Sequence, residues 1–148
     1  MQRAMTSAER RVLQLIAVLA LAGMVVSSVS LRHHYGTSQT NYCDFGTSFN
    51  CDIVNRSVYS TVLGVPDAVV GILGYGLLFG IATFYRTKAE ASYLLLAAST
   101  AGLAFALYLT YIEKFVLATW CILCLSSLSL IVLITGCCSF LAARSMRR

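Results

Sequence analysis

Four long apolar stretches constrain this chain more than any other feature of its sequence. They cover residues 12–31, 66–85, 91–112 and 117–143, and each reaches the length of about 20 mostly apolar residues that a membrane helix needs. Of the 148 residues, 58% are hydrophobic and 11% are charged, whereas about a quarter of the residues in soluble domains are charged. The sequence therefore predicts one all-α integral membrane domain over residues 1–148, a bundle of four transmembrane helices.

The first stretch also fits a secretory signal, because it is an apolar run that basic residues precede. Its apolar run is longer than the core of about 7–15 residues that is typical of such signals. We therefore expect it to be an uncleaved first helix, which also keeps the number of crossings even.

Basic residues predict the orientation, because Lys and Arg concentrate in short cytoplasmic loops. If both termini are cytoplasmic, eight basic residues lie on that side and three lie opposite, namely Arg32, Arg56 and Lys114. The acidic residues of the opposite side are Asp44, Asp52, Asp67 and Glu113. The net charge of +5 is then a topology signal and gives no reason to expect nucleic acid as a partner.

Four of the six cysteines fall on the non-cytoplasmic face in this topology. Cys43 and Cys51, the outer pair, lie in the long loop over residues 32–65. Cys121 and Cys124, the inner pair, begin the fourth helix just beyond a short turn. In a bacterial envelope or in the endoplasmic reticulum lumen, this is the oxidising side, where disulfides form and persist.

The spacing of both pairs permits redox chemistry. Cys121 and Cys124 lie one turn apart on a helix start, which favours the thiolate, although two such cysteines also fit a role as small buried hydrophobes. Cys43 and Cys51 can bridge either as a static loop disulfide or as a pair that exchanges with the inner pair through mixed disulfides. Two pairs on one membrane face favour the relay.

The electron acceptor is expected to enter from the membrane. The sequence has no nucleotide loop, flavin motif or metal-binding histidine pair, and the wide spacing of Cys43 and Cys51 disfavours a four-cysteine zinc site. A lipid-soluble quinone suits a dithiol, because both exchange two electrons and two protons. We therefore expect a quinone substrate and no metal or flavin.

Several smaller features have ordinary structural interpretations. His33 and His34 are adjacent and are expected in a solvated loop. Gly71, Gly74 and Gly76 favour close helix packing, with a glycine-lined pocket as the alternative.

The loop and the last helix carry further expectations. Residues 52–61 are expected to form a short helix on the membrane face, although residues 57–62 also have strand-like composition. Cys137 and Cys138 lie about 20 Å along the helix from Cys124, where packing is the expected role and palmitoylation the alternative.

Together these residues resemble the vitamin K epoxide reductase family, including its bacterial single-domain members. The matching positions span nearly the whole chain and are Cys43-Asp44-Phe45-Gly46, Phe49-Asn50-Cys51-Asp52, Ser57, Gly64-Val65-Pro66, Gly71, Tyr75 and Trp120-Cys121-Ile122-Leu123-Cys124. The resemblance implies that Cys43 receives electrons from a thioredoxin-fold partner. It also implies that Cys51 passes them to Cys121 by a mixed disulfide and that Cys124 faces the quinone.

In bacterial relatives the flow supports disulfide formation in exported proteins, so the resemblance favours a bacterial inner membrane over the endoplasmic reticulum. It also implies a quinone pocket at or near Ser57, Asp67, Val70, Tyr75 and Leu128. Ser57 fits a hydrogen bond near the pocket or an ordinary loop cap.

Two positions depart from the vertebrate enzymes of the family. Asp67 stands where those enzymes carry an asparagine that hydrogen-bonds the quinone oxygen, so it would have to be protonated or act through water. Its alternative role is that of a helix-start acid that complements the dipole. Leu128 stands where they carry a tyrosine that contacts the ring, which favours plain quinone reduction over epoxide reduction.

Two other functions compete with the thiol oxidase. One is epoxide reduction proper, and the other is a structural tetraspan scaffold of the claudin type, whose first outer loop also carries a disulfide. The second outer loop here is only a few residues long, which is too small for an adhesion surface.

Overall fold

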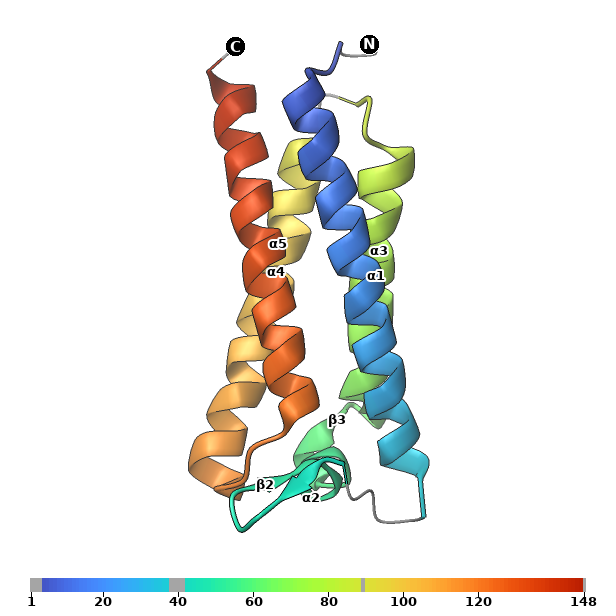
Figure 1. Ribbon diagram of the computed structural model, residues 1–148, viewed down its shortest axis with the longest axis vertical. Coiled ribbons are helices and arrows are strands. Elements are labelled where there is room, and N and C mark those ends of the chain that lie inside the picture. The colour runs from blue at the N-terminus through green and yellow to red at the C-terminus, as the bar shows by residue number, and fades with distance from the viewer. Residues whose placement is uncertain (1–3, 38–41, 89, 148) are drawn as a thin grey trace.

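The computed structural model describes residues 4–37, 42–88 and 90–147. Within them, four helices are long and apolar enough to cross a membrane. They are α1 (Ser7–Tyr35), α3 (Asp67–Phe84), α4 (Ala91–Ile112) and α5 (Ile122–Met146). The helices run side by side, with both ends of the chain at one end of the bundle and the loop between α1 and α3 at the other, which we call the loop end (Figure 1). The expected four-helix membrane fold is confirmed.

The first helix extends beyond the predicted residues 12–31 at both ends. It begins after a capping box in which the Thr6 hydroxyl accepts from the N–H of Glu9 at 3.3 Å, while Glu9 Oε2 accepts from the N–H of Thr6 at 2.9 Å. With its 29 residues and a rise of about 1.5 Å per residue, this helix is longer than the hydrocarbon thickness of about 30 Å. Hydropathy detects only the apolar middle of such a helix.

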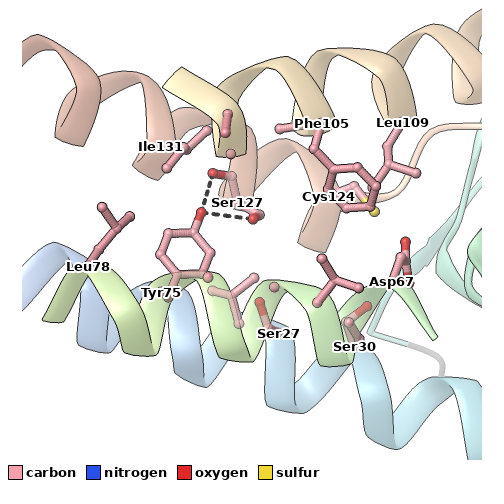
Figure 2. A pocket seen from close by; sticks show the side chains of 18 of the residues that line it. Ser27, Ser30, Asp67, Tyr75, Leu78, Phe105, Leu109, Cys124, Ser127 and Ile131 are labelled. Atoms are coloured by element: carbon pink, nitrogen blue, oxygen red, sulfur yellow. Dashed lines mark hydrogen bonds between the residues drawn. The ribbon is translucent and has the colours of Figure 1, made fainter. Parts of the chain in front are cut away.

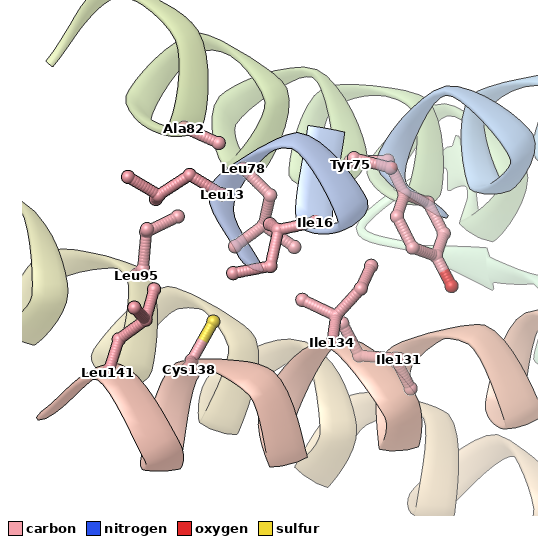
Figure 3. Packing of buried hydrophobic residues seen from close by; sticks show 11 residues of the cluster. Leu13, Ile16, Tyr75, Leu78, Ala82, Leu95, Ile131, Ile134, Cys138 and Leu141 are labelled. Carbon is pink, nitrogen blue, oxygen red and sulfur yellow. The ribbon is translucent and has the colours of Figure 1, made fainter. Parts of the chain in front are cut away.

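The core fills the space between the helices with aliphatic side chains. Figure 3 shows the central group, which includes Ile16 of α1, Leu78 of α3, Leu95 of α4 and Ile134 of α5. Ile16, Leu95 and Ile134 are fully buried. Bundle packing of this kind holds α1 against α3 and α5, and α4 against α5 and α3.

Small residues let α1 and α3 approach closely. A Cβ added to Gly23 of α1 would overlap the ring of Tyr75, and one added to Gly71 of α3 would lie 2.6 Å from the Ser27 hydroxyl. Gly71 thus has the predicted packing role. Gly74 has open space at its missing Cβ and borders a cavity, which matches the pocket alternative.

The loop end contains short elements that the all-α prediction lacked. Strand β1 (Asp44–Phe45) pairs antiparallel with β2 (Phe49–Asn50), and α2 (Cys51–Asn55) follows directly. A single 3-10 turn, η1 (Val58–Ser60), leads to β3 (Thr61–Val62), which pairs with β4 (Val65–Pro66).

The expected helix over residues 52–61 is therefore only partly right. Its first part is helical, and the strand-like composition further on reflects the second hairpin. Leu63 and Gly64 form the turn of this hairpin with φ values of 53° and 82°, and a type I′ hairpin turn needs a positive φ at both central residues.

The connection between the last two long helices is irregular. Helix α4 continues into a π-helical turn, η2 (Glu113–Leu117), and Ala118 then adopts a left-handed conformation with φ 49°. The chain runs through Trp120 and Cys121 before α5 begins at Ile122. The fourth helix thus starts five residues later than predicted, because Leu117, Ala118, Trp120 and Cys121 continue the apolar run in the sequence.

Candidate active site

Backbone hydrogen bonds attach the loop to the segment that precedes α5. The N–H of Asn50 donates to the carbonyl of Trp120 at 3.1 Å, and the N–H of Trp120 donates to the carbonyl of Ser48 at 2.9 Å. A parallel bridge joins Phe49 to Trp120. The residues just before Cys51 and Cys121 are therefore neighbours in space.

The outer pair is a disulfide. Cys43 and Cys51 immediately flank Asp44 and Asn50, which are opposite one another in the β1–β2 hairpin, and their Cα atoms are 5.6 Å apart. Both cysteines are buried. The hairpin thus explains why two cysteines eight residues apart can be bridged.

The inner pair consists of two free thiols at the start of α5. Cys121 is the residue before the helix and is fully buried, and Cys124 lies in the first turn. A hydrogen bond from the Cys124 thiol lowers the pKa of Cys121, and the backbone N–H groups of Leu123 and Cys124 act in the same direction. The Cys121 thiol therefore loses its proton more readily than an ordinary cysteine thiol does.

One buried cluster contains both pairs. Cys43, Cys51 and Cys121 pack together with Val54, and Cys124 packs against this group. A readily ionised thiol and a disulfide in such contact can exchange through a mixed disulfide. The structure therefore brings together all four cysteines that the sequence pointed to.

Glu113 is a site residue that the sequence analysis missed, because it was assigned to a short outer turn. Its side chain is only 2% exposed, and its Oε2 accepts the N–H of Cys121 at 3.1 Å. Its carboxyl group also interacts with the Cys124 thiol. An acidic residue at the end of an apolar stretch, eight positions before Cys121, was the available signal.

Asn55 also contacts the inner pair. Its side chain is 1% exposed, its Nδ2 donates to Cys121 Sγ at 3.9 Å, and its Oδ1 accepts from the Ser30 hydroxyl of α1 at 2.7 Å. The amide thus fixes the Cys121 thiol relative to α1. Nothing in its sequence context distinguished it from an ordinary loop asparagine.

The prediction that His33 lies in a solvated loop is wrong. His33 belongs to the last turn of α1 and is 4% exposed. Its Nδ1 pairs with Asp52 Oδ1 at 3.2 Å, and its Nε2 hydrogen-bonds the Tyr42 hydroxyl at 2.6 Å. His34 hydrogen-bonds the carbonyl of Asn55. The two histidines fasten the loop to α1 because the helix continues four residues beyond its apolar segment.

An apolar cavity of about 360 Å³ lies beside the inner pair and is bordered by all four long helices. Figure 2 shows Cys124 and Asp67 at the loop end of this cavity and Tyr75 further along it. The Tyr75 hydroxyl donates to the carbonyl of Ser127 at 2.8 Å and is 2.9 Å from the hydroxyl of that serine. The size and lining suit a flat apolar ring with a few polar contacts.

The other three residues that were expected in the quinone pocket lie in different places. Val70 borders the cavity with Asp67 and Tyr75. Ser57 instead borders a small adjacent cavity, and its hydroxyl donates to the carbonyl of Val54 at 2.9 Å, as a loop cap does. Leu128 packs against the core of the bundle and is absent from the cavity lining, so the expected ring contact does not fit this side chain.

The described part of the chain contains no arrangement that fits the alternative of a four-cysteine zinc site. Cys43 and Cys51 are bonded to each other, and no group of three or more His, Cys, Asp or Glu side chains among residues 4–37, 42–88 and 90–147 is placed to hold a metal ion.

The fold and the site define a class, the membrane-embedded oxidoreductases. The model of the vitamin K epoxide reductase family matches residues 14–138, and the chain belongs to this family. Family membership supports a role in quinone oxidoreduction within a membrane. Among curated proteins, a direct comparison gives no match.

Proposed function

We propose that this protein is a thiol:quinone oxidoreductase that supports disulfide formation in exported proteins. A thioredoxin-fold partner reduces the Cys43–Cys51 disulfide, and Cys51 passes the electrons to Cys121 through a mixed disulfide. Cys124 then delivers them to a lipid quinone. The observation that carries this proposal is the shared buried cluster of both cysteine pairs next to an apolar cavity.

The chemistry of the last step balances without any further group. Two S–H bonds of the inner pair break, one S–S bond forms between Cys121 and Cys124, and the quinone gains two electrons and two protons. The lowered pKa of Cys121 favours this step, because the thiolate is the nucleophile that closes the disulfide.

Recognition of the quinone follows from the cavity lining. Apolar side chains of α3 and α4 enclose the ring and tail, and Asp67 stands beside Cys124 at the loop end. A neutral Asp67 carboxyl group can donate the hydrogen bond to a quinone oxygen that an amide donates in the vertebrate enzymes. Because Leu128 has no hydroxyl where the vertebrate enzymes carry a tyrosine that contacts the ring, plain quinone reduction is favoured over epoxide reduction.

Both termini lie at the end opposite the loop, which agrees with cytoplasmic termini and a loop end on the oxidising face of a bacterial inner membrane. The basic residues Arg10, Arg11 and Arg144 gather at the terminal end of the bundle, as this orientation requires.

The test is anaerobic mixing of the reduced full chain in lipid nanodiscs with menaquinone and ubiquinone analogues. Quinol formation and cysteine alkylation are followed together, and the number of disulfides formed in the two pairs should match quinol one to one. Cys124→Ala should abolish quinone reduction. Cys137→Ala, which removes a cysteine near the opposite end, is the matched control and should retain it. If neither quinone is reduced by the unsubstituted chain, the proposal fails.

A further inference from the structure

The two oxygens of the buried Glu113 carboxylate differ in their hydrogen bonding. Oε2 accepts the N–H of Cys121, whereas Oε1 has no hydrogen-bond partner among the described residues, although the side chain is 2% exposed. Leaving a buried polar atom unpaired is costly, and such atoms often have a catalytic role. Glu113 also sits in a π-helical turn, a geometry that recurs at functional sites.

The surroundings of Glu113 connect it to both the thiol and the cavity. Its carboxyl group interacts with the Cys124 thiol of α5 and with Asp67 of α3. Glu113 and Asp67 border a common small cavity of about 10 Å³, close to the space that one water needs. Asp67 also borders the large cavity together with Cys124 (Figure 2).

We propose that Glu113 is the catalytic base that takes the proton of the Cys124 thiol and that Asp67 is the acid that delivers a proton to the quinone oxygen. This inference rests on the proposed function and assigns the proton path of the same site. It explains why two carboxyl groups are buried next to a thiol pair in an otherwise apolar bundle.

The protons and electrons balance as follows. Glu113 starts as a carboxylate and accepts the Cys124 proton, and the resulting thiolate forms a C–S bond to the quinone ring. Cys121 sulfur then attacks Cys124 sulfur, so the S–S bond forms, the C–S bond breaks, and its electron pair stays on the ring. Asp67 gives its proton to the quinone oxygen, and the proton held by Glu113 replaces it across the small cavity. The proton of Cys121 completes the quinol, so both acids return to their starting states.

The first test compares Glu113→Gln with the unsubstituted chain, using pre-reduced full-length protein in nanodiscs and a menaquinone analogue. The amide keeps an oxygen for the N–H of Cys121 but cannot accept a proton. General-base catalysis contributes 10²–10⁴-fold, so kcat should fall by about 100-fold or more with little change in KM. Glu113→Asp should recover part of the loss. A kcat for Glu113→Gln within about threefold of the unsubstituted chain would overturn the proposal.

The chain offers a matched control in Glu9, another buried glutamate, in the capping box at the opposite end of the bundle. Glu9→Gln removes a buried carboxylate without touching the site and should leave kcat unchanged. An equal loss in Glu9→Gln would show that the effect is structural and would overturn the assignment.

Asp67→Asn separates proton delivery from binding. Asparagine can still donate a hydrogen bond to the quinone oxygen but has no proton to give, so KM should stay near its original value while kcat falls. An unchanged kcat would remove Asp67 from the path.

Infrared difference spectroscopy of the unsubstituted chain keeps the test independent of how the variants fold. Quinone addition to the reduced protein should produce a transient carboxylic acid band that shifts in D₂O, and its absence would overturn the proposal. The proposed function is tested separately, because Cys124→Ala must abolish quinone reduction whatever Glu113 does. A chain that reduces quinone and is indifferent to Glu113→Gln keeps the function and loses this proton path.

Discussion

The backbone N–H of Asn50 donates to the carbonyl of Trp120 at 3.1 Å, which ties the residue before Cys51 to the residue before Cys121. Together with the hydrogen bond from the N–H of Trp120 to the carbonyl of Ser48, this contact links the loop to the start of α5 across 70 positions of sequence. Both cysteine pairs meet there in one buried cluster, which is the arrangement that the proposed exchange requires.

The mixed disulfide between the two pairs should therefore be trappable. In the double variant Cys43→Ala with Cys124→Ala, the remaining Cys51 and Cys121 should form a stable bond under mild oxidation. Peptide mass spectrometry under non-reducing conditions measures it. The comparison variant, Cys43→Ala with Cys121→Ala, leaves Cys51 and Cys124 and should form far less. Equal yields in the two variants would contradict the arrangement of the pairs.

The ionisation of Cys121 should depend on Cys124. The pKa of Cys121 lies below that of an ordinary thiol chiefly because the Cys124 thiol donates to it. Its thiolate should therefore form at lower pH than that of a free cysteine. Cys124→Ala removes the largest cause of this shift, so the titration should move to higher pH. Ultraviolet thiolate absorbance, with Cys121→Ala as the blank, measures both curves, and coincident curves would refute the prediction.

Asn55→Leu should weaken the site and the fold together. The substitution removes the donor to Cys121 and leaves the buried Ser30 hydroxyl without its acceptor. Losing such a buried partner costs about 1–3 kcal/mol. We expect a lower midpoint in thermal unfolding and slower oxidation of the inner pair by quinone. Ile53→Leu, in the same short helix but half exposed, is the control and should change neither.

Gly23→Ala should disturb the cavity through Tyr75. The added methyl group would overlap the tyrosine ring, which would have to move toward the cavity that it borders. Overpacking of this kind costs about 1–3 kcal/mol, and KM for the quinone should rise. Gly80→Ala, where the added carbon meets open space, should leave KM unchanged and hold or raise the unfolding midpoint. A KM for Gly23→Ala equal to that of Gly80→Ala would contradict this account.

The four membrane helices and the two cysteine pairs could be read from the sequence by itself. Hydropathy depends on runs of neighbouring residues, so the spans at residues 66–85 and 91–112 were placed within one residue of α3 and α4. The even number of crossings then put the loop and the start of α5 at one end of the bundle. Local composition was sufficient for all of this.

The direction of individual side chains was decided only by the tertiary structure. Glu113 turns inward because a π-helical turn changes the helical phase just before the chain reaches Cys121. His33 is buried because α1 continues beyond its apolar segment and meets the loop at Asp52. Leu128 faces the core because packing fixes the rotation of α5. These outcomes depend on contacts between residues far apart in the chain, and hydropathy contains no term for such contacts.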